Sequence, residues 1–335
     1  MNDIPLLKGS TEGFRRFAIH LISLQKILGA AAAAPDPAQR LYALGARAPL
    51  FQLEGLARIY ENLHNRHRFE KLRLTFKLLE DQLGRIDYYD GFRKEFSANP
   101  HCTPAVLEGL HSRMEQETQT LNTLLQTTGW LQQDGRRLKK TVSKLDGARY
   151  LSQEKEKKLF RCFWNNELAR LQHEYHSGIL NCHDIENGVH KIRRSLRWFS
   201  IYAQAMNGLV QLDQEPPLSH PEYASYLTRE VVESPFNRMP AWNQSSKPLY
   251  VKAPVFYLLS ALIAKLGVLK DNGLRIILLD ELTKEHVSGA QTFEKMIILK
   301  RKDKSATLDT IKQEAKREID ECFFRFHLLR DLMIP

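Results

Sequence analysis

The sequence predicts an all-α protein built from two antiparallel four-helix-type bundles. Apolar residues recur at helical spacing along most of the chain. Glycine and proline, the residues that interrupt helices, number 17 and 14 among 335 residues, whereas helix-forming Leu, Ala, Glu, Lys, Arg and Gln are abundant. A chain of this length favours two domains. We place the boundary at Asp146-Gly147, which gives an N-terminal bundle at 1–147 and a C-terminal bundle at 148–335.

The first half is predicted to form helices at about 11–29, 37–64, 67–97 and 104–130, followed by a short basic helix that ends at Leu145. Pro37 suits the first turn of the second helix. Pro49 lies inside the same pattern, so we expect this helix to kink or split there.

The second half is predicted to form helices at about 151–178, 184–212, 252–270, 273–287 and 306–332. The proline-rich stretch 213–249 is expected to be a long connection with one short helix at 221–232. The Lys/Arg-rich stretch 296–305 is expected to be a solvated loop. The last helix is predicted to bury five apolar side chains: Phe323, Phe324, Phe326, Leu328 and Leu329.

Targeting and cysteine patterns favour a cytoplasmic protein. Met1–Leu7 contains Asp3 and lacks a basic segment leading into an apolar core. The apolar runs Phe17–Ala34 and Ala253–Ala264 are too polar or too short to span a bilayer and are expected to be buried helices. The four cysteines form no C-x-x-C pair, which is typical of reduced thiols. We expect no membrane partner.

The charge balance favours an anionic partner. Lys and Arg number 49 against 39 Asp and Glu, so the formal net charge is +10. A basic excess alone defines no function.

The segment Val189–Phe199 is the most informative. On a helix, with about 100° per residue, four basic positions fall within an arc of roughly 100°: His190, Arg193, Arg194 and Arg197. Apolar Ile192, Leu196 and Phe199 lie on the opposite side. No carboxylate occurs between Val189 and Ala203, and guanidinium groups bind phosphate oxygens bidentately. The pattern fits an anion-binding face and equally a solvated amphipathic helix.

Other basic helix faces supply secondary anion contacts: Arg15, Arg16, Arg66, Arg73, Lys77, Arg136, Arg137, Lys140 and Lys144. Any one of these is more often a solvated face. Several together on a +10 chain favour an extended polyanion-binding surface.

No catalytic or metal-binding pattern is identified, so we expect a protein that is not an enzyme and has no metal or cofactor. Glu154 and Glu156 match a Glu-x-Glu-x-Lys pattern, but on a helix they lie about 200° apart. His173, His176, Cys182 and His183 lack a recognised ligand spacing. A glycine-rich phosphate loop and a nucleophile elbow are both missing from the sequence.

These motifs resemble the CHAD family, whose name refers to a histidine in an α-helical domain. The resemblance rests on His190-x-x-Arg193-x-x-x-Arg197, entered through Asp184-Ile185-Glu186, and on the turn at Leu83–Asp87. It implies two four-helix bundles related by pseudo-symmetry that bind inorganic polyphosphate without catalysis. Under it, His190, Arg193 and Arg197 face the polyanion and Lys191 and Arg194 flank it. The corresponding region of the first half, near 42–58, keeps only Arg47 and Arg58, so that half is expected to be degenerate.

Two other functions stay open. A basic helix face could follow nucleic-acid phosphates, with Trp198 and Tyr202 as stacking groups. The same face could make the protein an adaptor that docks an acidic protein partner.

Overall fold

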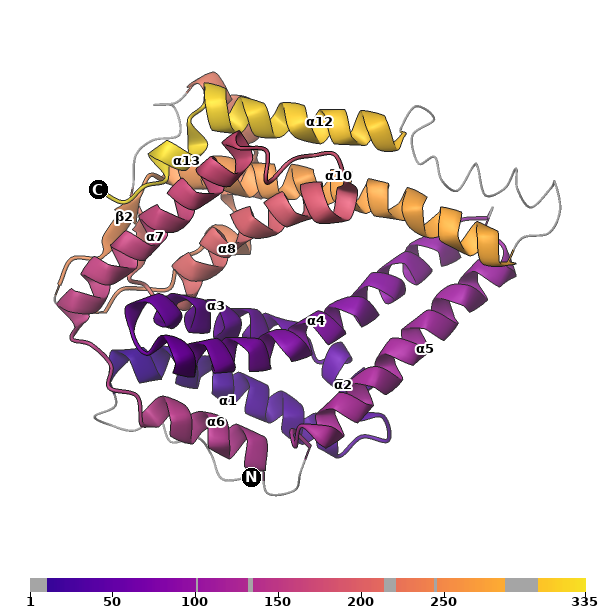
Figure 1. The fold of residues 1–335 in the computed structure, drawn as a ribbon, viewed down its shortest axis with the longest axis horizontal. Helices are drawn as coiled ribbons and strands as arrows, with labels where there is room; N and C mark the ends of the chain where they lie inside the picture. Colours follow the sequence, from indigo (N-terminus) through magenta and orange to yellow (C-terminus); the bar gives the residue numbers. More distant parts are fainter. Residues whose placement is uncertain (1–10, 101, 132–134, 214–220, 244–245, 287–306) are drawn as a thin grey trace. The chain divides into compact units, whose positions relative to one another are not determined.

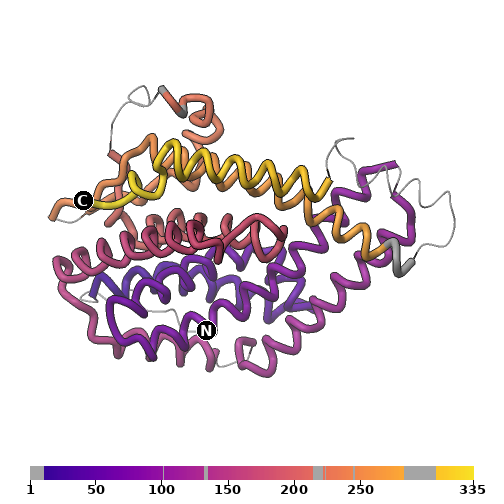
Figure 2. The backbone as a smooth tube through the Cα atoms, turned by 45° about the horizontal axis from the view of Figure 1, so that its top comes forward, coloured from indigo at the N-terminus to yellow at the C-terminus, as the bar shows by residue number. Residues whose placement is uncertain are grey.

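The computed structural model describes residues 11–100, 102–131, 135–213, 221–243, 246–286 and 307–335 (Figure 1). Helices make up most of these residues, which confirms the predicted helical character. Figure 2 shows the same backbone as a tube in which helices predominate throughout. The predicted stretch 296–305 lies outside the described residues.

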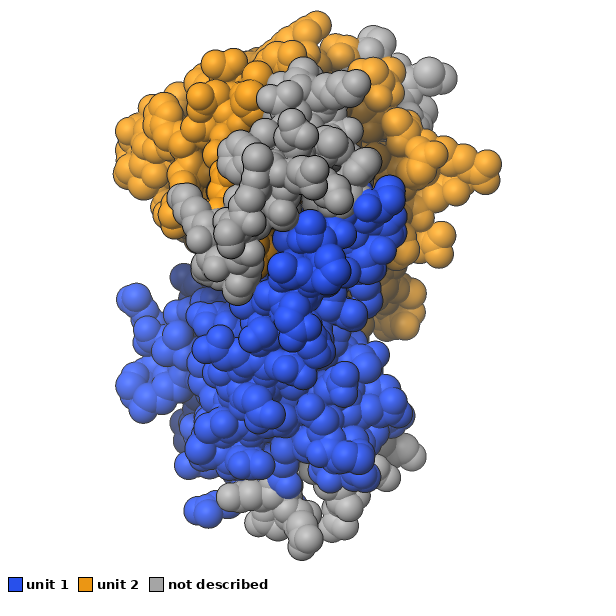
Figure 3. All heavy atoms as spheres, turned by 90° about the vertical axis from the view of Figure 1, so that its right-hand side faces the viewer, with its two compact units in different colours: residues 1–156, 286–288 blue, residues 157–285, 289–335 orange. Residues whose placement is uncertain are grey.

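The chain forms two compact units, which Figure 3 colours separately. The first runs to Glu156 and the second begins at Lys157. The division therefore falls in the first turns of a helix rather than at Gly147, where the sequence placed it.

The first unit contains six helices among its described residues: α1 Glu12–Ala32, α2 Pro37–Ala43, α3 Arg47–Leu63, α4 Arg66–Ser97, α5 Pro104–Thr127 and α6 Arg136–Asp146. Helix α3 packs against α4, α4 against α5, and α1 against both α3 and α6. Side-chain caps begin three of them. Thr11 accepts from the backbone N–H of Phe14, Asp36 from that of Gln39 and Asn65 from that of Arg68. The core includes Phe17, Leu21, Leu53, Phe69 and Phe76, all buried.

The predicted helix at 37–64 splits, but not at Pro49. It divides into α2 and α3 around Gly45, whose φ is 72°, a left-handed conformation that side-chain-bearing residues rarely adopt. Pro49 lies in the first turn of α3, where the amide N–H that proline lacks has no partner within the helix. The turn glycine, and not the proline, therefore breaks this helix.

A buried ion pair holds the start of α7 (Gln153–His176) in the first unit. Arg16 of α1 is fully buried and pairs with the carboxylate of Glu156, which is 2% exposed. Nη1 of Arg16 also donates to the hydroxyl of Tyr60 at 2.9 Å, and this hydroxyl in turn donates to the Glu156 carboxylate. This pair explains why the unit extends to Glu156. It also corrects one prediction, because a fully buried Arg16 is not an anion contact.

The described second unit consists of helices and one short sheet. Its α-helices are α7, α8 Lys191–Ala205, α9 Arg229–Val232, α10 Ala253–His286, α12 Leu308–Asp320 and α13 Leu328–Asp331. Its shorter turns are the π-helical η1 Ile185–His190 and η5 Glu321–Arg325, and the 3₁₀ turns η3 Pro221–Tyr226 and η4 Pro235–Asn237. Trp164 of α7 packs edge-on against Phe199 of α8, with ring centroids 5.2 Å apart. Lys265 of α10 reaches Glu318 of α12 at 2.7 Å.

The predicted helix 184–212 ends earlier than expected. Asn207 and Gly208 have φ values of 51° and 88°, which end α8. The chain then forms β1 Val210–Leu212, which pairs in parallel with β2 Leu249–Val251. The proline-rich connection therefore joins two strands, and its expected short helix appears as η3 followed by α9.

The predicted helices at 252–270 and 273–287 form one continuous helix, α10. A glycine inside a helix costs only about 1 kcal/mol, and Asp271–Gly273 contains no proline. Among the described residues, Ala253–Leu282 of this helix is long and apolar enough to cross a membrane by length and composition alone; 61% of its most apolar window is buried in the protein. The apolar run is thus longer than the sequence pattern indicated.

The predicted helix 306–332 is divided at His327, whose φ is 51°. Four of the five apolar side chains expected to be buried there are buried, namely Phe323, Phe326, Leu328 and Leu329. The fifth, Phe324, is 43% exposed, because the π-helical turn η5 changes the helical register in this segment.

Candidate functional site

The basic segment around His190 is helical, as expected, and its apolar side is buried. It comprises η1 and the first two turns of α8. Ile192, Leu196 and Phe199 lie in the core of the second unit. Lys191 and Arg194 are exposed, and Arg197 is half-buried.

His190 lies beside a carboxylate. Its Nδ1 is 2.9 Å from Oε2 of Glu186, one turn earlier in η1. The hydrogen bond from His190, followed by the charges of His190, Lys270 and Arg194, lowers the pKa of Glu186 against the effect of its burial. The stretch without carboxylates that the sequence shows begins at Val189, three residues after Glu186. The sequence pattern therefore left the Glu186 carboxylate out of the basic face.

Arg193 points toward α10 rather than toward solvent. Its Nε donates to the backbone carbonyl of Ile263 at 3.1 Å. The guanidinium lies against Gly267, where a Cβ atom would be 3.1 Å from Nε. Burial lowers the pKa of Arg193, and Asp271 acts in the opposite direction. Arg193 therefore joins α8 to α10, and the five predicted residues do not form one exposed face.

The aromatic residues of α8 are not exposed stacking platforms. Trp198 and Tyr202 are buried, and their rings stack on each other with centroids 5.7 Å apart. The two rings expected to stack on nucleic-acid bases are therefore part of the protein core.

Several of the predicted secondary contacts are neutralised. Arg15 pairs with Glu12 at 3.5 Å, Arg73 with Glu61 at 2.7 Å and Lys77 with Asp81 at 2.5 Å. Arg66 is exposed at the start of α4, and Arg136 is exposed at the start of α6. These residues do not gather at one place.

The cations of α6 do gather, with two residues of α4. Arg137, Lys140 and Lys144 follow each other at i, i+3 and i+7 and share one face of α6. On α4, Arg68, Lys71 and Thr75 have the same spacing. We call Arg68, Lys71, Arg137, Lys140 and Lys144 the α4–α6 basic surface.

Two contacts fix how these faces meet. Arg137 Nη2 donates to Oγ1 of Thr75 at 3.1 Å. At the other end, Arg68 Nη1 donates to the backbone carbonyls of Gly147 at 2.8 Å and Lys144 at 3.3 Å. The two rows are therefore antiparallel, since Thr75 matches Arg137 and Arg68 matches Lys144. Lys71 lies close enough to Lys144 for its charge to act on that ammonium group.

The electrostatics of this surface are those of an unbalanced positive cluster. Burial, and then the like charges of Lys140, Arg137, Lys71 and Arg68, lower the pKa of the Lys144 ammonium. Within the described part of the chain, the ammonium groups of Lys71, Lys140 and Lys144 have no ion-pair partner. Cations held together in this way favour a bound anion.

Sequence reasoning identified three of these five residues and missed Arg68 and Lys71. The signal was present, because Arg68-x-x-Lys71-x-x-x-Thr75 has helical spacing. Sequence reasoning grouped Arg66, Arg73 and Lys77 instead. That Arg68 and Lys71 face α6 depends on how α6 folds back, which helical spacing alone does not give.

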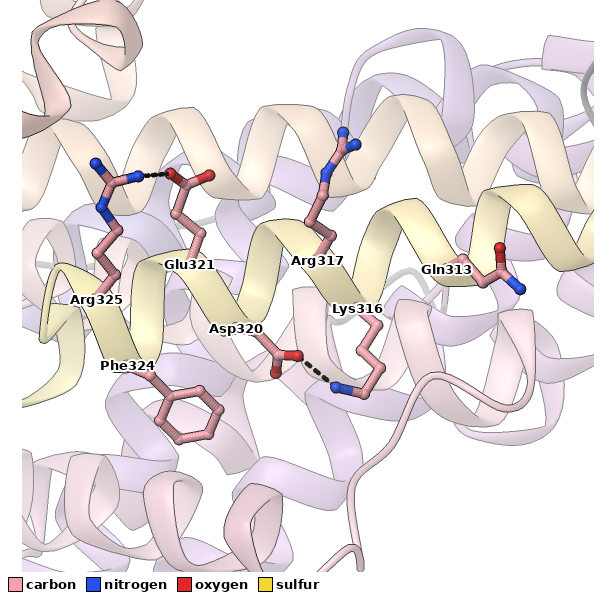
Figure 4. A pocket seen from close by; sticks show the side chains of 7 residues that line it. All are labelled: Gln313, Lys316, Arg317, Asp320, Glu321, Phe324 and Arg325. Atoms are coloured by element: carbon pink, nitrogen blue, oxygen red, sulfur yellow. Dashed lines mark hydrogen bonds and ion pairs between the residues drawn. The ribbon is translucent and has the colours of Figure 1, made fainter.

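A shallow depression also lies along α12 and η5 (Figure 4). It is lined by Gln313, Lys316, Arg317, Asp320, Glu321, Phe324 and Arg325. Lys316 pairs with Asp320 and Arg325 with Glu321, as the dashed lines show. Its charges are balanced locally, so it lacks the unpaired cations of the α4–α6 basic surface.

The residues considered as zinc ligands do not converge. Among the described residues, no group of three or more His, Cys, Asp and Glu side chains could hold a metal ion. His173 and His176 are exposed, and the ring of His176 packs against Phe324 instead. Burial, which outweighs Glu318 and Glu321 as a cause, raises the pKa of the Cys322 thiol, and burial also raises the pKa of Cys182 to about 11. Neither thiol is activated as a nucleophile.

Comparisons with protein-family models, with curated proteins and with solved structures give no match to this chain.

Proposed function

We propose that the protein binds a phosphate-bearing polyanion without catalysis, and that the α4–α6 basic surface is the principal site. Inorganic polyphosphate is the expected ligand. The observation that carries this proposal is the convergence of five cations from two helices. Three of these cations, the lysines, have no ion-pair partner in the described chain.

The two types of cation have different roles in this proposal. Arg68 and Arg137 each use part of their guanidinium to hold α6 beside α4. Their positions are therefore fixed before a ligand binds, which lowers the entropic cost of binding. Lys71, Lys140 and Lys144 are exposed and supply mobile ammonium groups for phosphate oxygens. Binding would release the counterions that otherwise surround the phosphates.

The segment around His190 contributes less than the sequence suggested. Lys191 and Arg194 stay exposed and add positive charge to the second unit, but Arg193 is engaged with α10 and His190 with Glu186. We retain the resemblance to the CHAD family, with its two related bundles, as part of this proposal. The observed helical character supports it only in general terms.

Nucleic-acid binding at the His190 segment loses its expected stacking groups, because Trp198 and Tyr202 are buried. Sequence-tolerant binding of single-stranded nucleic acid normally relies on exposed aromatic rings. Competition between polyphosphate and duplex DNA at equal salt tests this choice. Preference for DNA would reject polyphosphate as the ligand.

The direct test compares two double variants with the same spacing and the same change in charge. Lys140→Gln/Lys144→Gln removes two unpaired cations of the α4–α6 basic surface. Lys312→Gln/Lys316→Gln removes two cations of α12 that pair with Asp309 and Asp320. In a titration with long-chain polyphosphate we expect the first variant to bind at least 10-fold more weakly than wild type and the second to bind like wild type. Equal affinities of the two variants would refute the site.

A further inference from the structure

Two exposed leucines adjoin the α4–α6 basic surface. Leu74 and Leu78 of α4 are 51% and 50% exposed and lie one helical turn apart. Single exposed leucines are ordinary on protein surfaces. These two are notable for their position beside unpaired cations.

The helical spacing places them on the cationic side of α4. Taking Lys71 as 0°, Leu74, Thr75 and Leu78 fall at about 300°, 40° and 340°. All four therefore lie within an arc of roughly 100°. Thr75 is the residue that receives the Arg137 guanidinium from α6, so the leucines are within one turn of the point where the two helices meet. Asp81, one turn further, is paired with Lys77.

This combination fits a particular type of anionic partner. A soluble polyphosphate chain interacts with the cations and gains nothing from aliphatic side chains. Nucleic-acid bases stack on aromatic rings, not on leucines. The surface of an anionic bilayer offers phosphate groups to cations and, a few ångströms deeper, apolar chains to leucines.

We propose that the α4–α6 basic surface docks on an anionic phospholipid bilayer. Its cations would lie on the head-group phosphates while Leu74 and Leu78 enter the boundary between head groups and acyl chains. The inference rests on the cation cluster of the proposed function but assigns it a lipid surface as partner. It concerns surface docking and requires no membrane-spanning helix.

The test is co-sedimentation of the full-length protein with vesicles of phosphatidylcholine alone and with vesicles that also contain phosphatidylserine. We expect binding only to the second kind, weakened by added salt. Lys140→Gln/Lys144→Gln should reduce binding to these vesicles roughly 25-fold, because each basic residue near an anionic membrane contributes about fivefold. Leu74→Ser/Leu78→Ser should reduce it at least 10-fold, because the exposed half of each leucine side chain would no longer be buried among the lipids. Ile19→Ser/Leu159→Ser, which changes one exposed aliphatic residue of α1 and one of α7, is the matched control and should bind like wild type.

The leucine variant also separates this inference from the proposed function. It should keep wild-type affinity for polyphosphate, which shows at the same time that it is folded. Vesicle binding that is unaffected by Leu74→Ser/Leu78→Ser, or absent in wild type at low salt, would overturn docking. Vesicle binding without polyphosphate binding would refute the proposed function and leave the docking surface in place.

Discussion

The number of cations in the α4–α6 basic surface predicts how polyphosphate binding depends on salt. For single-stranded polyanions, log K falls with log [salt] with a slope of about −0.7 for each phosphate neutralised. Five cations therefore give a slope of about −3.5, and raising salt from about 50 to 200 mM should weaken binding roughly 100-fold. Lys140→Gln/Lys144→Gln leaves three cations, a slope of about −2.1, and a loss of only about 20-fold over the same range.

The assay is fluorescence anisotropy of end-labelled polyphosphate, titrated with protein at four or more salt concentrations. Lys312→Gln/Lys316→Gln serves as the control, because those lysines are already paired with carboxylates and their removal should leave the slope unchanged. If the Lys140→Gln/Lys144→Gln variant keeps the wild-type slope, the phosphates are neutralised elsewhere and the reasoning is refuted.

Three other predictions concern the buried ion pair, a partly buried histidine and a surface lysine. Arg16→Met should lower the free energy of unfolding by about 3–5 kcal/mol in urea denaturation, because it leaves the Glu156 carboxylate buried without its partner. The double variant Arg16→Met/Glu156→Met should be less destabilised than Arg16→Met alone. Strictly additive effects of the two substitutions would contradict this prediction. Burial lowers the pKa of His20 from its ordinary value of 6.5 to about 4. Between these two pH values the imidazole is protonated in the unfolded chain and neutral in the folded protein. Stability should therefore decrease as pH falls from about 6.5 to 4, by at most about 3 kcal/mol from this residue, and a His20→Leu variant with the same pH profile would refute that origin. Polyphosphate should raise the depressed pKa of Lys144. Binding just below the ordinary lysine pKa of 10.5 should therefore take up protons, measured by calorimetry in buffers of different ionisation enthalpy, and no uptake there would argue against contact.

Helix positions were predictable because they depend on local pattern. The bounds of α4 and α5 differ by a few residues at most from those expected, since Asn65 caps the start of α4 and Pro104 suits the first turn of α5. The errors fall where local signals compete. Gly45 rather than Pro49 breaks one helix, and Asp271–Gly273 does not break α10. In both cases the outcome depends on position within the helix, not on residue type alone.

The candidate site was only partly predictable, for a different reason. Helical spacing correctly groups Arg137, Lys140 and Lys144 on one face, because that grouping lies within one helix. It cannot show that Arg68 and Lys71 face them from α4, which depends on the fold of the chain between residues 75 and 137. It also cannot distinguish an exposed arginine from one that reaches a carbonyl of another helix, as Arg193 does at Ile263.

The central claim is that unpaired cations on α4 and α6 are where the polyanion binds. The most direct measurement is lysine acetylation with and without polyphosphate, mapped by mass spectrometry. We predict protection of Lys71, Lys140 and Lys144, with Lys312 and Lys316 modified equally in both samples. Protection that is confined to Lys191 would contradict the claim. Equal protection of the three surface lysines and of Lys312 and Lys316 would also contradict it.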